Sequence, residues 1–220
     1  KEVMTVSSQD ESPDQNFQPG KILMAAIRFN ESQFKEALLP FVNNYGIEDA
    51  YIRFYQPLLE KSRILWQTGS LSRAQEQFVR NTIRQILTIE DYNLKVPLLS
   101  SKSCVAMINT SDYMSDNNFL FYKYLLKKRG FDVIFTGGIL PASEVIEIHK
   151  IKPFEYLIVN SAAFDFARKK INYFSSIGKS LLIRKIVLTD FPEPQEKKIP
   201  ENIVISRNPG DFRKAIAVFK

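Results

Sequence analysis

Apolar residues recur every three to four positions through the first half of the chain, a spacing that predicts amphipathic helices. Four such segments follow one another with short connections: residues 22–29, 30–46, 47–68 and 72–89. Two of them begin at an Asn or Ser that precedes a Gln by three positions, a capping-box signature. These pairs are Asn30 with Gln33 and Ser72 with Gln75. The pattern predicts a four-helix bundle over residues 21–95, after a polar linker over residues 1–20.

The second half changes to short β-branched runs that alternate with helical segments. The predicted strands are residues 104–108, 132–135, 156–159, 183–188 and 203–205. The predicted helices are residues 118–129, 142–151, 164–177 and 211–218. Such alternation predicts a flavodoxin-like (Rossmann-like) domain over residues 100–220, with a five-stranded parallel sheet covered by helices on both faces. In this fold class, ligands bind at the carboxyl ends of the strands.

Composition narrows the classes of function. The chain has 220 residues, 45% of them hydrophobic, and shows neither an apolar run of membrane-spanning length nor a leader-like start. We therefore expect a cytoplasmic protein with no membrane partner. The net charge of +6 comes from 30 basic and 24 acidic residues without long blocks of one sign, a pattern typical of a mixed, solvated surface.

The chain has too few Cys and His residues for the usual metal sites and nucleophile pairs. The chain has one Cys and one His, so a zinc cage or a Cys/His nucleophile pair cannot be assembled from them. We predict no catalytic residue, no metal ligand and no enzymatic activity. The lone His149 lies in a predicted amphipathic helix and is expected at the surface, and Cys104 is expected to be a small buried strand residue.

Three short motifs stand in a fixed order in the first half. They are Tyr-Gln-Pro-Leu-Leu at residues 55–59, Leu-Trp-Gln-Thr-Gly-Ser-Leu-Ser at residues 65–72 and Ala-Gln-Glu-Gln-Phe at residues 74–78. This order resembles the helical module that precedes the cobalamin-binding domain in MerR-type transcriptional regulators and in corrinoid methyltransferase-type proteins. The resemblance covers about residues 22–220, and the α/β half is the partner that it implies.

The resemblance implies positions for the upper face of a corrinoid. Trp66 and Glu76 match the Trp and Glu that cap this face, whereas Gln77 stands where the family has His. Asn81 lies one helical turn after Gln77 and is expected to share its polar patch. The alternative for Trp66 is a plain bundle-core residue. A buried Glu76 would need a partner or a ligand.

The lower face departs from the family's Asp-x-His-x-x-Gly pattern. The position of the cobalt-binding His falls on Ser115, that of Asp on Tyr113 and that of Gly on Asn118. Phe191, followed by prolines, stands where small residues hold the nucleotide tail. Cobalamin is thus the cofactor that the resemblance implies. The ordinary cobalamin site is expected to be degenerate, so the sequence does not decide which cofactor, if any, is bound.

Any remaining ligand is expected in a cleft between the two halves. The strand ends contribute Asn109, Ser115, Asn160 and Ser161, with Asn118 just beyond. Trp66, Glu76 and Gln77 should face these residues across the cleft. The full predicted binding set is Trp66, Glu76, Gln77, Asn81, Asn109, Ser115, Asn118, Asn160 and Ser161.

These observations favour the effector and oligomerisation part of a MerR-type regulator. A small molecule or a light state would be sensed between the halves, the chain would be a homo-oligomer, and DNA would be contacted only through a missing domain before Lys1. Two alternatives stay open. One is a ligand-free protein-interaction module with a sealed cleft, and the other, ranked last, is a corrinoid protein that transfers methyl groups.

Overall fold

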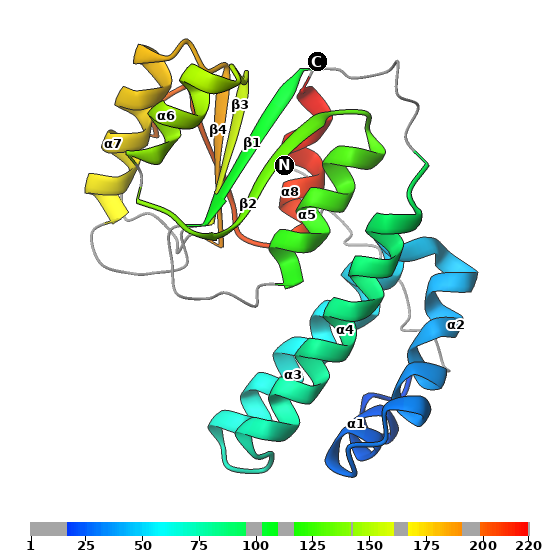
Figure 1. The fold of residues 1–220 in the computed structure, drawn as a ribbon. Coiled ribbons are helices and arrows are strands. Elements are labelled where there is room, and N and C mark those ends of the chain that lie inside the picture. Colours follow the sequence, from blue (N-terminus) through cyan, green and yellow to red (C-terminus); the bar gives the residue numbers. More distant parts are fainter. Residues whose placement is uncertain are drawn as a thin grey trace, which may run out of the picture.

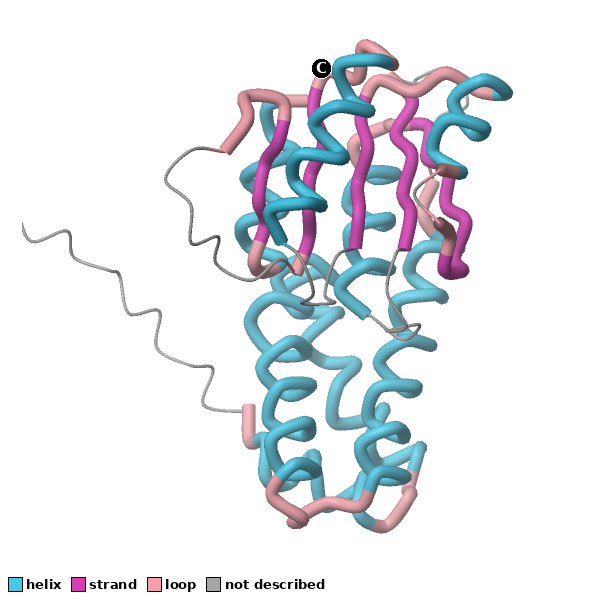
Figure 2. Tube along the Cα trace, turned by 90° about the vertical axis from the view of Figure 1, so that its left-hand side faces the viewer, coloured by secondary structure: helices cyan, strands magenta, loops and turns pink. Residues whose placement is uncertain are grey.

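A helical half and an α/β half lie against each other in this protein (Figure 1). The computed structural model describes residues 17–95, 103–109, 117–141, 143–160, 167–190 and 199–219. The predicted fold class is confirmed: an N-terminal helical region is followed by a five-stranded parallel sheet. Figure 2 shows the helices of the helical half extending well beyond one end of the strands.

The helical half contains the four predicted helical segments. They are α1 (Pro19–Ile27), α2 (Glu31–Ala50), η1 with α3 (Tyr51–Tyr55 and Gln56–Gln67) and α4 (Arg73–Asn93). Both predicted N-caps are present. The Asn30 side chain accepts a hydrogen bond from the Gln33 amide, and Ser72 and Gln75 form the reciprocal capping box.

The connection between the second and third predicted helices is a kink and not a loop. Gly46 has φ 73° and ψ 160° inside α2, and the helix resumes directly after it. A left-handed φ of this kind favours glycine. Residues Tyr51–Tyr55 then form a π-helix, η1, before α3 continues as an ordinary α-helix. The third predicted helix is thus confirmed in extent, with one wide turn that its apolar pattern did not reveal.

The α/β half is a doubly wound sheet. Its strands are β1 (Cys104–Asn109), β2 (Asp132–Ile139), β3 (Tyr156–Asn160), β4 (Lys185–Thr189) and β5 (Ile203–Ser206), all parallel in the order β2-β1-β3-β4-β5. Its helices are α5 (Asn117–Lys128), α6 (Glu144–Ile151), α7 (Ala167–Ser180) and α8 (Pro209–Ala215), followed by the short 3-10 helix η2 (Ile216–Val218). Figure 1 shows α6 and α7 on one face of the sheet and α5 and α8 on the other.

Strand β2 is longer than predicted. The sequence predicts a strand ending near residue 135 and a turn at the following glycine pair, but the strand runs through Gly137 to Ile139. Gly137 has φ 71°, and the pairing of β1 with β2 shifts register between Met107 and Asn109. The glycine therefore accommodates an irregularity within the edge strand instead of ending it.

The helical half docks on the face of the sheet that carries α5 and α8. Tyr51 of η1 stacks on Phe121 of α5, with ring centroids 4.2 Å apart and planes inclined by 19°. Ion pairs surround this contact, and they join Glu48 to Lys128, Asp49 to Arg213, and Asp91 to Lys123 and Lys127. A single cluster of buried apolar residues continues from α1–α4 into α5, α8 and this face of the sheet.

Asp91 is a charged anchor of this interface. Partial burial acts to raise the pKa of its carboxyl group, but hydrogen bonds and charges from Lys123 and Lys127 outweigh burial and lower the pKa below its usual value. Because its pKa is lowered in the folded protein, ionised Asp91 stabilises the fold at pH values above the ordinary pKa of Asp. This contribution to stability is lost as the pH falls through the lowered pKa.

Gly178 marks a close approach of α7 to the sheet. A Cβ at this position would lie 2.8 Å from both Ile186 Cδ1 and Asn202 Nδ2. Ile186 is fully buried, and Asn202 is held by hydrogen bonds to Ser175 at 2.9 and 3.0 Å. We expect Gly178→Ala to lower the free energy of unfolding by about 1–3 kcal/mol, as overpacking does. Chemical denaturation measures this change.

Gly20 provides the matched control. It also lies in a helix, α1, but a Cβ there would meet nothing within 4 Å. Gly20→Ala should be neutral or slightly stabilising, because alanine is the better helix former. Equal stability of the two variants would contradict the close packing of α7 on β4.

Within the described residues, no helix combines the length and the apolar character needed to cross a membrane.

Candidate functional site

A row of buried polar side chains ends the strands of the sheet. Asn109, Asn160, Thr189 and Ser206 are the last residues of β1, β3, β4 and β5, and they are neighbours in register. Each is at most 4% exposed. Met107, Ile158 and Val187 stand two residues earlier and belong to the core under α5 and α8. Because side chains alternate along a strand, the polar row lies on that same face.

The predicted strand-end residues can be placed only in part. Asn109 and Asn160 are paired in register at the carboxyl edge, as the sequence predicts. Ser115 and Ser161 lie outside the described residues, and so does Phe191. Ligand binding by any residue of this set stays a prediction.

Asn118 bridges the two halves of the molecule. Its Oδ1 accepts a hydrogen bond from the Tyr51 hydroxyl at 2.8 Å, and its Nδ2 donates to Asp190 Oδ1 at 3.2 Å. Asp190 directly follows β4 in a left-handed conformation, with φ 53°, and its amide donates to the Ser206 carbonyl. The side chain at the position where the resemblance expects glycine thus ties η1 to the carboxyl edge of the sheet.

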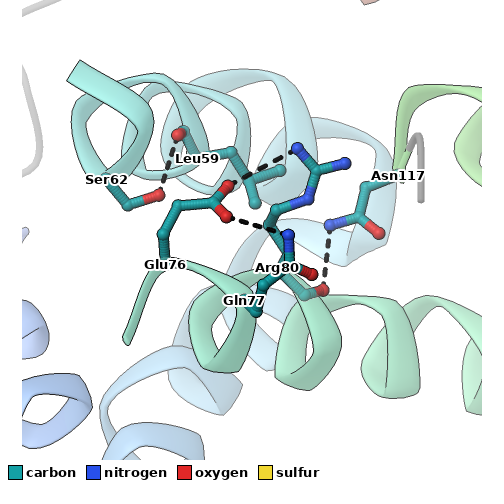
Figure 3. A network of polar contacts seen from close by, with 6 residues as sticks. All are labelled: Leu59, Ser62, Glu76, Gln77, Arg80 and Asn117. Carbon is teal, nitrogen blue, oxygen red and sulfur yellow. Dashed lines mark hydrogen bonds and ion pairs between the residues drawn. The ribbon is translucent and has the colours of Figure 1, made fainter. Parts of the chain in front are cut away.

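Glu76 is buried and paired within the protein. The residue is 2% exposed. Its Oε1 lies 3.5 Å from Arg80 Nη1, and its Oε2 accepts a hydrogen bond from Gln77 Nε2 at 3.2 Å (Figure 3). The prediction that a buried carboxylate here needs a partner is confirmed, and this partner is Arg80, one helical turn further along α4.

A cavity of about 110 Å³ lies where the helical half meets the start of α5. Its walls come from η1 and α3, from α4 and from the first turn of α5: Tyr51, Gln56, Leu59, Glu60, Arg63, Arg80, Asn117 and Asn118. Asn117 is 4% exposed, and its Nδ2 donates to the Arg80 carbonyl at 3.1 Å (Figure 3). Two arginines, three side-chain amides, one carboxylate and a phenol therefore line one small space.

The predicted position of Trp66 opposite the strand ends is wrong. Trp66 lies in the last turn of α3 and packs, partly buried, against the core of the helical half. The turn from α3 to α4 is at the end of the helical half that points away from the sheet (Figure 1). The indole follows its apolar neighbours into the bundle, which is the alternative that the sequence left open.

Gln77 and Asn81 do not form a wall of the cavity. Both are exposed on α4, and Gln77 uses its amide to hold Glu76. We expected Trp66, Glu76 and Gln77 to face the sheet together. Instead, Arg80 is the residue of α4 that contacts the start of α5. The rise of the helix explains the difference, because the residue that contacts Asn117 lies on the same face of α4 as Glu76 but one turn nearer to α5.

The sequence interpretation missed Tyr51, Arg63, Arg80 and Asn117. One signal was available: Arg80 follows Glu76 by four positions, the spacing at which opposite charges meet on a helix. The other contacts join residues far apart in the chain, and no local pattern marks them.

His149 and Cys104 show no sign of ligand chemistry. His149 Nδ1 accepts a hydrogen bond from the Phe154 amide at 3.3 Å, and its ring meets the Phe154 ring edge-on. Burial raises the pKa of the Cys104 thiol, with Asp132 adding to the rise, which disfavours the thiolate. Among the residues that the structure describes, no group of three or more His, Cys, Asp or Glu is placed to hold a metal ion.

The residues present do not fit a corrinoid in the way that the resemblance implies. Glu76 is engaged by Arg80, and Asn118 joins Tyr51 to Asp190 across the edge that the nucleotide tail would pass.

Comparison with solved structures shows which known fold this chain shares. No protein-family model matches the chain, and no curated protein matches it. Among solved structures, the monomethylamine corrinoid protein of Methanosarcina barkeri is similar with a TM-score of 0.66 at 12% identity, over 93% of this chain and 98% of that one. The fold shared with a corrinoid protein therefore includes both the helical region and the α/β sheet.

Two further structures are more distant. The methanol:cobalamin methyltransferase complex of Methanosarcina barkeri has a TM-score of 0.45 at 13% identity, over 97% of this chain and 85% of that one. A cobalamin-binding protein from Desulfitobacterium hafniense has a TM-score of 0.41 at 13% identity, over 91% and 97%.

Proposed function

We propose that this chain is a protein-interaction module that has the fold of a corrinoid-binding protein but holds no corrinoid. The observation that carries the proposal is the Tyr51–Asn118–Asp190 bridge. It places protein side chains at the carboxyl end of β4, and it links η1 of the helical half to α5 and β4 of the α/β half. Part-buried hydrogen bonds between the halves favour one arrangement of the two, because other arrangements would lose them.

The partner that we propose is a second copy of the chain. Ile89 and Tyr92 lie three positions apart on α4 and are 54% and 88% exposed. Residues at this spacing are neighbours on a helix surface, so the two side chains offer an apolar contact on the outer face of the helical half. Self-association through this contact would give the homo-oligomer that the sequence predicts.

The effector half of a MerR-type regulator is a more specific form of this proposal. The motifs at residues 55–78 support this form. In such a regulator, self-association would bring together two DNA-binding domains that lie outside this chain. The reading frame upstream of Lys1 tests this form directly, because such a regulator would encode DNA-binding helices there.

Corrinoid binding with methyl transfer is the second candidate. The similarity of both halves to a corrinoid protein favours it. It would need the Asn118 bridge to open and a cobalt ligand other than the missing His.

One sedimentation-velocity experiment separates these candidates. Protein mixed with hydroxocobalamin is followed at a corrin wavelength and at 280 nm. We expect the colour to remain with the small molecules and the protein to sediment as a dimer or larger species. Ser115→His should behave in the same way, because the bridge at Asn118 is unchanged. Colour that sediments with the wild-type protein would establish the corrinoid candidate, and a monomer without colour would refute the self-association.

A further inference from the structure

We propose that the end of the helical half that points away from the sheet docks on a membrane surface containing anionic lipids. The contact surface, named the α1 surface, consists of Lys21, Met24, Ile27, Arg28, Phe29 and Arg73. Figure 1 shows α1 and the turn from α3 to α4 at this end. The proposal goes beyond the interaction module and does not depend on it. The sequence predicts no membrane partner because no segment spans a bilayer, but docking on a membrane surface needs no spanning segment.

The centre of the α1 surface is apolar and open to solvent. Met24 and Ile27 lie three positions apart on the outer face of α1, where they are 46% and 38% exposed. Phe29 follows the helix after one residue and is 52% exposed. The core contacts of the helix come from its opposite face, which buries Ile22, Leu23, Ala25 and Ala26. Packing of α1 therefore does not account for the apolar residues on its outer face.

Phe29 has a backbone conformation that its side chain opposes. Its φ is 52°, in the left-handed region. The Phe29 amide donates to the Ala26 carbonyl at 3.0 Å, and the Asn30 amide donates to the Ala25 carbonyl at 2.9 Å, which is the Schellman pattern of a helix end. Glycine is usual at this position because a Cβ disfavours left-handed φ values. Phe29 meets the ring of Phe78 edge-on but stays half-exposed, and strained residues of this kind cluster at functional sites.

The edges of the α1 surface are basic. Lys21, Arg28 and Arg73 are exposed, and their side chains form no hydrogen bond or ion pair with the described part of the chain. Residues 20–35 and 67–75, which form this end of the molecule, contain four basic residues and one acidic residue. That acidic residue, Glu31, is already paired with Lys35. The unpaired bases therefore give this end a positive charge that attracts an anionic surface.

Apolar side chains bordered by unpaired bases favour a lipid surface over the other occupants. The apolar side chains can enter the boundary between head groups and acyl chains while the bases stay beside the lipid phosphates. A peptide helix docks in a hydrophobic groove, whereas Met24, Ile27 and Phe29 stand on the outer face of a helix and on its closing turn. A second copy of the chain that docked through the same surface would bring like charges together.

Co-sedimentation of the full chain with extruded vesicles tests the proposal. At low salt the protein should bind vesicles of phosphatidylcholine mixed with phosphatidylglycerol. It should bind vesicles of phosphatidylcholine alone at least about tenfold more weakly, because these attract no bases. Added sodium chloride should weaken binding to the anionic vesicles by screening the charges. No binding to the anionic vesicles, or equal binding to both kinds, would overturn the proposal.

A matched pair of variants separates the α1 surface from the overall charge of the protein, which is +6. Phe29→Asn should weaken binding at least about tenfold, because asparagine accepts the left-handed conformation but offers no ring to the membrane. Leu182→Asn is the control. Leu182 also has a left-handed φ, 55°, and is 87% exposed, but it lies in the α/β half just before β4. Equal effects of the two substitutions would overturn the assigned surface.

A second pair tests the basic edge. Lys21→Gln should weaken binding about fivefold, whereas Lys179→Gln, which removes an exposed base from α7, should leave it nearly unchanged. Equal effects here would also overturn the assignment, and this pair decides should Phe29→Asn not fold. Sedimentation velocity without vesicles should show the same oligomeric state for Phe29→Asn and the wild type. Dissociation of this variant would assign the surface to a second copy and refute the membrane contact.

Discussion

Replacing Glu76 with Leu is expected to lower the free energy of unfolding by about 3–5 kcal/mol, the range for removing one member of a buried ion pair. Glu76 is 2% exposed and is held by Arg80 and Gln77. The substitution leaves the poorly solvated Arg80 guanidinium without its carboxylate. Equilibrium denaturation in urea, without any ligand, measures the change.

The control is the double variant Glu76→Leu/Arg80→Leu. Removing both charges should recover much of the lost stability, because a buried ion pair can be replaced by apolar side chains at little cost. Non-additivity of the two substitutions then reports the pair itself. A Glu76→Leu variant as stable as the wild type would show that the carboxylate is kept for a ligand, as expected for functional residues that cost stability, and would favour an effector sensor over a sealed module.

Tyr51→Ala should be comparably damaging, with a loss of about 3–5 kcal/mol, as for other large aromatic residues removed from a core. Tyr51 is fully buried, stacks on Phe121 and donates its hydroxyl hydrogen to Asn118. The substitution removes the ring that packs η1 against α5. Urea denaturation measures the loss, and hydrogen exchange of α5 amides should show increased local opening.

Tyr51→Phe separates the ring from the hydroxyl group. It keeps the stacking on Phe121 and removes only the hydrogen bond to Asn118, so the expected loss is about 1 kcal/mol. If the phenylalanine variant lost as much stability as the alanine variant, the polar bridge and not the packing would hold the halves together.

The sequence was most informative where a signal is local. Asn30 with Gln33 and Ser72 with Gln75 mark helix starts because the capping side chain reaches an amide only three residues away. The alternation of apolar strands and helices likewise predicts the parallel sheet, since connections of this type allow few topologies. Strand β2 was underestimated because Gly137, read as a turn, takes its left-handed conformation inside the strand.

The candidate site was harder to predict because it is assembled from distant segments. Tyr51 and Asn118 are 67 positions apart, and Asn118 and Asp190 are 72 apart. The resemblance drew attention to Trp66, yet an aromatic residue on an amphipathic helix is placed by the core it can enter. Glu76 was identified correctly as a buried carboxylate that needs a partner, and the i, i+4 spacing to Arg80 was the unused clue.

The π-helix η1 also sets the rotational phase of α3. A π-turn takes in one residue more than an α-turn, so every α3 side chain is turned by about 100° from where an unbroken α-helix would put it, given 3.6 residues per turn. Gln56, Leu59 and Arg63 reach the junction with α5 through this offset. A lineage that gained or lost one residue within Tyr51–Tyr55 would therefore keep every helix while exchanging the face that α3 presents to the sheet.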